Sequence, residues 1–249
     1  MKLRLGAAVL LAALIPLTAV TSSSPASAGT EVDITPPAVG SCHDLTWDEF
    51  YSAAEEPEAP VDCAGPHTSL TVRVTEIDPV DDWEASWGDI VNREYVPCLK
   101  ALVAATGGRP DLVLMSTYRL TFYRPTEEQR EAGASWVRCD AVVWGKQGTI
   151  MRMPTDVVMD GSRPPASVRR CLLGKRQDYA TVVCTMRHQY IATWAFKMPH
   201  DRYPGERRAK EFAHRKCHDK LGSGDWVYTW IYKSYWRAGL RYAVCSPAD

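Results

Sequence analysis

The eight cysteines constrain this chain more than any other feature of its sequence. They stand at positions 42, 63, 98, 139, 171, 184, 217 and 245. An even number of cysteines behind a secretion signal is typical of disulfide-bonded proteins in oxidising compartments. We therefore expect four disulfides and a fold of short elements that these bonds fasten together.

The first residues show the three parts of a signal peptide. Lys2 and Arg4 precede an uncharged apolar run over 6–20, and Ala26-Ser27-Ala28 offers the small residues that signal peptidases cleave after. The run is shorter than the roughly 20 residues that a membrane-spanning helix needs. We predict a signal peptide over 1–28 that is cleaved near Ala28, a flexible leader over 29–39, and a secreted or surface-located protein. An uncleaved membrane anchor is the alternative.

The cysteines fall into two sets of four with matching surroundings. Cys63 and Cys184 are each followed four residues later by a histidine. An Ala-Gly pair also precedes the last cysteine of each set, and its glycine lies six residues before Cys139 in one set and before Cys245 in the other. Matched spacing in the same order indicates an internal repeat, and chance spacing is the alternative.

The repeat divides the mature chain into two domains and a connection. We predict one copy over 40–145 and a second copy over 168–249. The segment 146–167 between them is rich in glycine and proline, so it is interpreted as a linker.

Each copy shows the same order of secondary-structure patterns. Alternation of period two predicts a strand after each Cys-x-x-x-His element, and the apolar spacing becomes helical around Cys98 and Cys217. Further strands are predicted over 112–123 and 226–232, and final strands carry the last cysteine of each copy. The predicted fold class is α+β: two tandem small domains, each an antiparallel sheet with one helix packed on it, stapled by disulfides.

Spacing alone leaves several disulfide pairings open within each copy. A cysteine on the buried face of a helix can meet a cysteine on the strand beneath it when the Cα atoms lie close enough. For this reason we favour pairing first with second and third with fourth: Cys42–Cys63, Cys98–Cys139, Cys171–Cys184 and Cys217–Cys245.

The first copy resembles a known family in its motifs. Gly40-Ser-Cys42, the element Val61-Asp-Cys63-Ala-Gly-Pro-His67, a helix cysteine and Ala-Gly before a final strand cysteine are similar to the septum-formation domain of actinobacterial envelope proteins. The second copy is more loosely similar, because Arg187 replaces the proline before His188. The resemblance implies a role in envelope growth or division and supplies no catalytic residue to transfer.

The common enzyme motifs are not found in the sequence. It contains no Gly-x-Ser-x-Gly, His-Glu-x-x-His or phosphate-binding glycine loop. We therefore predict no catalytic residue, no cofactor and no metal site, and a hydrolase with a site between the two copies is the alternative. His67 and His188 are interpreted as structural histidines that bond the backbone, because zinc needs thiolates and secreted cysteines are oxidised.

The two halves carry opposite charge. Residues 29–145 hold 8 basic and 21 acidic side chains, whereas residues 146–249 hold 19 basic and 9 acidic ones. A basic half in a secreted protein favours an anionic cell-wall polymer, an envelope protein or lipid headgroups as partners, and not nucleic acid. Docking of the two halves on each other and an ordinary solvated surface are the alternatives. The predicted anionic-ligand surface comprises Arg169, Arg170, Arg176, Arg207, Arg208, Lys210, Arg215, Lys216 and Lys220.

Four aromatic residues alternate along the predicted strand 226–232. They are Trp226, Tyr228, Trp230 and Tyr232. Exposed rings in a row would suit stacking on sugars, but the core of a small domain is the commoner place for such a row. We therefore expect these rings to be buried.

Overall fold

The computed structural model describes residues 32–52, 54–55 and 59–249. The predicted signal peptide and the start of the predicted leader lie outside this part of the chain. In the described part, no helix combines the length and apolarity that crossing a membrane requires.

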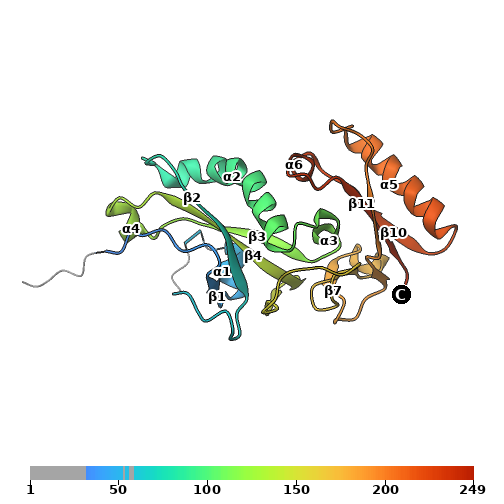
Figure 1. Cartoon of the computed structure of the whole chain (residues 1–249), viewed down its shortest axis with the longest axis horizontal. Helices are drawn as coiled ribbons and strands as arrows, with labels where there is room; N and C mark the ends of the chain where they lie inside the picture. The colour runs from blue at the N-terminus through green and yellow to red at the C-terminus, as the bar shows by residue number, and fades with distance from the viewer. Residues whose placement is uncertain (1–31, 53, 56–58) are drawn as a thin grey trace, which may run out of the picture. The chain divides into compact units, whose positions relative to one another are not determined.

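The first half is built on an antiparallel sheet. Its strands run in the order β1 (Cys42–His43), β2 (Ser69–Glu76), β4 (Trp136–Lys146) and β3 (Tyr118–Tyr123), and β5 (Thr149–Met151) pairs with β4. The long central strand β4 pairs with both β2 and β3 (Figure 1). The sequence therefore places a continuous strand, buried over most of its length, at the centre of the sheet.

Helix α2 (Trp83–Ala105) lies along one face of this sheet. The Asp82 carboxylate caps its N-terminus by accepting from the Ala85 amide at 2.9 Å. Cys98, Leu99 and Leu102 are buried on its inner side. The helix continues through Pro97 rather than ending there.

Short helices complete the first half. Helix α1 (Trp47–Ser52) lies in the acidic segment after β1, and α4 (Glu127–Glu131) begins at a capping box formed by Thr126 and Gln129. The strand predicted over 112–123 is wrong in its first part, because Pro110 starts helix α3 (Pro110–Leu114) and only residues 118–123 form β3. Proline favours the first helical turn, and a short apolar run fits a buried helix as well as a strand.

The second half contains two three-stranded antiparallel sheets. One has the order β7 (Thr181–Val183), β6 (Arg170–Leu172) and β8 (Tyr190–Ile191). The other has β10 (Trp226–Thr229), β11 (Tyr242–Pro247) and β9 (Trp194–Lys197). Helix α5 (Glu206–Leu221) packs on β10 and β11, and α6 (Lys233–Arg237) precedes β11. The short 3-10 helix η1 (Lys175–Gln177) follows β6.

Each half contains two disulfides. In each half a cysteine of the long helix is bonded to a cysteine of a strand: Cys98 of α2 to Cys139 of β4, with Cα atoms 6.0 Å apart, and Cys217 of α5 to Cys245 of β11, with Cα atoms 5.4 Å apart. The earlier pairs are Cys42–Cys63 and Cys171–Cys184. These four pairs are the ones favoured from the sequence, where a helix cysteine was expected to meet a strand cysteine, and each lies within one half.

Residues from both halves share one hydrophobic core. Buried side chains of this core come from α2, α3 and β4 and also from α5, β11 and the loops between them. Met153 and Met159, in the segment interpreted as a linker, are buried in the same core. The Arg170 amide also donates to the Met115 carbonyl at 2.8 Å, so residues 32–249 pack as a single unit.

Candidate functional site

Helix α5 carries basic side chains on its outer side, and its inner side packs on the sheet. Ala209, Phe212, Ala213 and Cys217 are buried against the sheet, and the disulfide from Cys217 fastens the helix to β11. Their helical spacing leaves the remaining side chains outside. Arg207, Arg208, Arg215, Lys216 and Lys220 are exposed there, and Lys210 is half-buried.

The four aromatic residues of β10 and the following loop form a row beside this helix. Successive ring centroids are 6.2, 6.0 and 6.1 Å apart from Trp226 to Tyr232. The expectation that they are buried in the core is wrong: the first three rings are half-buried, and Tyr232 is 54% exposed. The reason is that β10 is an edge strand of its sheet, so one side of the row has no neighbouring strand to cover it.

Side chains of α5 lie directly on these rings. The Lys210 Nζ stands 4.4 Å from the centroid of the Trp230 ring, a cation–π distance. The His214 ring lies 5.4 Å from Trp226 and 5.8 Å from Tyr228, centroid to centroid. The helix therefore presents the Lys210 cation over an aromatic face of the row, a combination that suits a ligand with both sugar rings and negative charge.

A groove of about 330 Å³ lies along the side chains of α5 and reaches the row at Tyr228. It is lined by Arg207, Lys210, Glu211, His214, Arg215 and Tyr228. Two ion pairs along the helix, Arg207–Glu211 at 2.8 Å and Lys210–Glu206 at 2.7 Å, hold the cationic side chains in place. The hydrogen bond to Glu206 also raises the pKa of the Lys210 amine, so this group stays charged. We call this groove and its ring row the α5–β10 face.

Six of the nine predicted anionic-ligand residues do not line this groove. Arg208, Lys216 and Lys220 are exposed on α5 outside it, and the other three lie elsewhere in the second half. Arg176 is exposed in η1. The Arg169 Nε donates to the Pro164 carbonyl at 2.8 Å. The Arg170 guanidinium donates to the Thr229 hydroxyl at 3.2 Å, so it occupies a different environment from the exposed cations of α5.

The two equivalent histidines bond the backbone in the same way. The His67 Nδ1 lies 2.9 Å from the Gly65 carbonyl, and the His188 Nδ1 lies 2.7 Å from the Met186 carbonyl, two residues before each ring. The ligand atoms of Cys171, Cys184 and His188 lie within 4.8 Å of one another. Because the two sulfurs are joined in a disulfide, the trio offers one imidazole rather than a set of metal ligands.

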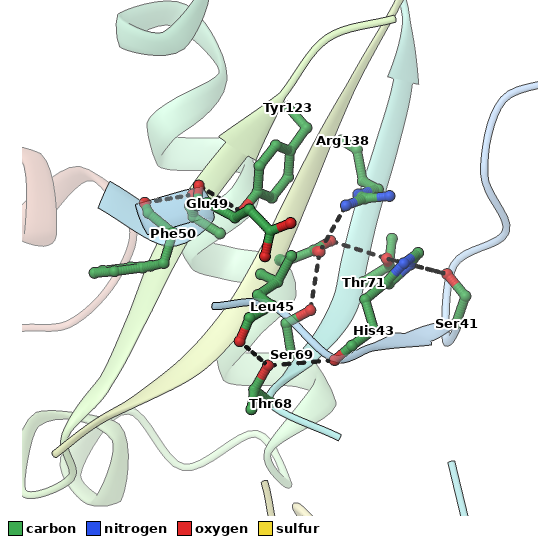
Figure 2. A network of polar contacts seen from close by, with 12 residues as sticks. Ser41, His43, Leu45, Glu49, Phe50, Thr68, Ser69, Thr71, Tyr123 and Arg138 are labelled. Carbon is green, nitrogen blue, oxygen red and sulfur yellow. Dashed lines mark hydrogen bonds and ion pairs between the residues drawn. The ribbon is translucent and has the colours of Figure 1, made fainter. Parts of the chain in front are cut away.

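A buried polar network in the first half was not foreseen from the sequence (Figure 2). At its centre, Asp140 of β4 is fully buried and accepts hydrogen bonds from the Thr71 hydroxyl at 2.8 Å and the Ser69 hydroxyl at 3.2 Å. Arg138 forms an ion pair with the same carboxylate at 3.2 Å. The network therefore joins strands β2 and β4 through their side chains as well as their backbones.

The network extends to β1 and to a tyrosine beneath the arginine. The Ser41 hydroxyl lies 3.1 Å from the His43 Nε2 and 3.1 Å from the Thr71 hydroxyl. Arg138 stacks over the ring of Tyr123 at 4.7 Å. Burial lowers the pKa of the Arg138 guanidinium, with the neighbouring Asp140 opposing this effect, and burial raises the pKa of the Tyr123 phenol.

The polar groups of this network are engaged by contacts within the protein. A serine beside an imidazole nitrogen is part of a nucleophile–base arrangement. However, the Ser41 hydroxyl also donates to the Ala38 carbonyl at 2.8 Å, and the Asp140 oxygens accept from Thr71, Ser69 and Arg138. The alternation of Ser69 and Thr71 along β2 was the one pattern in the sequence that could have pointed to this network. It shows that the two side chains share a face of the strand, but not that this face is buried.

Comparison with known proteins gives one match. A family model described as septum formation matches residues 39–245, a range that spans both halves of the chain. No curated protein and no solved structure matches the chain.

Proposed function

Because this chain belongs to the septum-formation family, we propose that it is a non-catalytic envelope protein that binds an anionic polymer of the cell wall. The family suggests a cell-division or envelope-associated role. The ligand, the binding mode and the lack of catalysis are the parts that we propose. The proposed binding site is the α5–β10 face.

The observation that carries the proposal is the contact between Lys210 and the Trp230 ring within the row of four aromatic residues. Aromatic faces in a row provide apolar area for sugar rings, and cations held beside them pair with carboxylate or phosphate groups. A wall polymer supplies both features in one repeating chain. The excess of basic residues in the second half adds long-range attraction for such a polymer.

The proposed location outside the cytoplasm rests on the cysteines. All eight cysteines are paired, and no free cysteine is present in the described residues. Disulfides persist in oxidising compartments and are rare in the cytosol. Four bonds of this kind fit an extracellular protein, and the predicted signal peptide would deliver it there.

Co-sedimentation with insoluble cell wall tests the proposal. The purified protein lacking residues 1–28 is mixed with wall preparations over a series of salt concentrations, and the bound fraction is measured. We expect binding that weakens as salt rises, because ions screen exposed charges over about 8 Å at physiological ionic strength. Binding that persists unchanged at high salt would rule out the contribution of the basic face.

A matched pair of variants locates the binding surface. The test variant replaces three groove cations with glutamine: Arg207, Lys210 and Arg215. The control replaces three exposed cations outside the groove: Lys100, Lys146 and Arg152. Both variants lose the same charge, so only the first should lose wall binding. Exposed ion pairs contribute about 0–1 kcal/mol to folding, so the test variant should remain folded.

A protein partner is the second candidate ligand for the same face. The half-exposed rings favour it, since aromatic residues are enriched in protein interfaces. In the wall assay this candidate predicts binding that disappears after the wall has been stripped of its proteins. Binding to wall that has been stripped of its proteins would exclude a protein partner and support the polymer as the ligand.

A hydrolytic activity is the alternative from a different class of function. The Ser41–His43 contact at 3.1 Å is the observation that favours it. We propose the non-catalytic reading because the Asp140 carboxylate of this network accepts from two hydroxyls and a guanidinium. Covalent labelling of Ser41 by a fluorophosphonate probe would support hydrolytic activity and contradict the non-catalytic proposal.

A further inference from the structure

Two adjoining cavities lie around the side chain of Arg170, outside the groove of the α5–β10 face, and the larger one is lined in part by Trp230 and Tyr232 of the ring row. A cavity of about 80 Å³ is lined by residues of α2, α3 and β3, and a second cavity of about 200 Å³ is lined by residues 229–232. Leu114, Arg170 and Tyr235 line both. This guanidinium therefore stands at the junction of the two cavities.

Arg170 has one polar partner for a group that can donate five hydrogen bonds. Its guanidinium donates to the Thr229 hydroxyl at 3.2 Å, and its buried Nε has no hydrogen-bond partner. Within the described ranges, no carboxylate lies within ion-pair distance of it. The backbone holds the residue in place, since its amide donates to the Met115 carbonyl and the next residue is bonded to Cys184.

The surroundings of Arg170 add positive charge and hydrogen-bond donors. Arg119 lines the smaller cavity with it, and neither lining contains an acidic residue. The rings of Tyr95 and Tyr235 meet edge to face with centroids 6.3 Å apart. Burial, and next the neighbouring Tyr235, raise the pKa of Tyr95, so its hydroxyl keeps its proton.

Arg170 is half-buried and its Nε is fully buried, and a cation that is withdrawn from water without a counter-charge is costly to keep. Burial is the main cause that lowers the pKa of Arg170 to about 10, and repulsion from Arg119 adds to it, yet the group remains charged at neutral pH. A charged guanidinium with unused donors, beside a second guanidinium and tyrosine hydroxyls, matches an anion with several oxygens. A phosphate group has more acceptor oxygens than a carboxylate and uses more of these donors.

We propose that the cavities around Arg170 bind a phosphate group, with Arg119, Thr229 and the two tyrosine hydroxyls completing the site. The larger cavity is below the roughly 300–1,000 Å³ of sites that enclose a whole drug-sized ligand. It therefore takes the phosphate group itself, either as a free ion or as part of a larger molecule that extends outside. This inference does not depend on the wall-binding proposal, because Arg170 does not line the groove of the α5–β10 face.

Calorimetric titration with inorganic phosphate tests the proposal on the purified protein lacking residues 1–28. Parallel titrations use sulfate and glycerol phosphate at constant ionic strength, so that a free ion and an esterified phosphate are distinguished. We expect saturable binding to one site, at least a tenfold weaker affinity in Arg170→Met, and partial recovery in Arg170→Lys. Arg176→Met removes an exposed arginine from the same half and should bind as the wild type does.

Thermal unfolding tests the same site through the stability of the protein. In phosphate-free buffer Arg170→Met should be no less stable than the wild type, because it removes an uncompensated buried charge. Phosphate should raise the melting temperature of the wild type and leave that of the variant unchanged. If Arg170→Met fails to fold, Thr229→Val and Tyr235→Phe serve instead, each with weaker phosphate binding. The proposal is overturned if the folded wild type shows no saturable binding, or if these variants bind as tightly as the wild type.

Discussion

Removal of the Asp140 carboxylate should destabilise the protein more than removal of any exposed acidic group. Asp140 is 0% exposed and its ion-pair partner Arg138 is 4% exposed at the side chain. Truncating one partner of a buried ion pair costs about 3–5 kcal/mol, because the other charge remains buried. The two hydroxyl donors, Thr71 and Ser69, would each lose a charged acceptor worth about 1.5–3 kcal/mol.

These two contributions overlap because they concern the same carboxylate. We therefore expect Asp140→Ala to lower the free energy of unfolding by about 3–5 kcal/mol, a large share of the typical 5–15 kcal/mol of a domain. Ser69→Ala removes one donor and should lose about 1–2 kcal/mol. Glu211→Ala breaks an exposed ion pair with Arg207 and should change stability by less than about 1 kcal/mol.

Urea unfolding with the disulfides intact measures these differences through tryptophan fluorescence. The reasoning is refuted if Asp140→Ala loses no more stability than Glu211→Ala. It is also refuted if Ser69→Ala costs as much as Asp140→Ala, because the carboxylate would then not be the centre of the network.

Three further predictions concern the disulfides, a turn and the hydrolase alternative. Replacing both Cys217 and Cys245 with serine opens a loop with a sequence separation of 28 and should cost about 3–4 kcal/mol in urea unfolding; a cost below about 1 kcal/mol would contradict the role given to this bond. Gly239 has φ of +89° with open space around its Cβ position, so Gly239→Ala should lose about 1 kcal/mol or more from backbone strain alone; no measurable loss of stability would show that the turn adapts. A fluorophosphonate probe should leave Ser41 unlabelled, and mass-spectrometric detection of an adduct there would reverse the assignment of this serine to a structural network.

The helix-to-strand bonds were predictable because local periodicity carries the needed information. Cys98 and Cys217 occupy the buried face of a helical pattern, and Cys139 and Cys245 lie in strand patterns, so a packed helix brings each pair together. The capping box of Thr126 and Gln129, where α4 begins, is likewise a pattern of neighbouring residues.

The polar network and the Arg170 cavities could not be predicted from local patterns. Period two places Ser69 and Thr71 on one face of β2, but whether that face is buried depends on the distant segments that cover it. Arg170 looks like any other basic residue in the sequence, and only the packing around Leu114 and Tyr235 half-buries its side chain beside the two cavities. The prediction for the ring row was wrong in the opposite sense: the rings were expected to be buried, but they are half-buried or exposed because β10 lies at the edge of its sheet.

The central claim, that the α5–β10 face binds an anionic wall polymer, is tested most directly by wall from which those polymers have been extracted. The bound fraction of the wild type and of the triple variant of Arg207, Lys210 and Arg215 is measured on intact and on extracted, protein-free wall. We predict that the wild type binds intact wall, and that extraction and the triple variant each abolish most of this binding. Equal binding of the wild type and the triple variant to intact wall, or wild-type binding that survives extraction unchanged, would contradict the account.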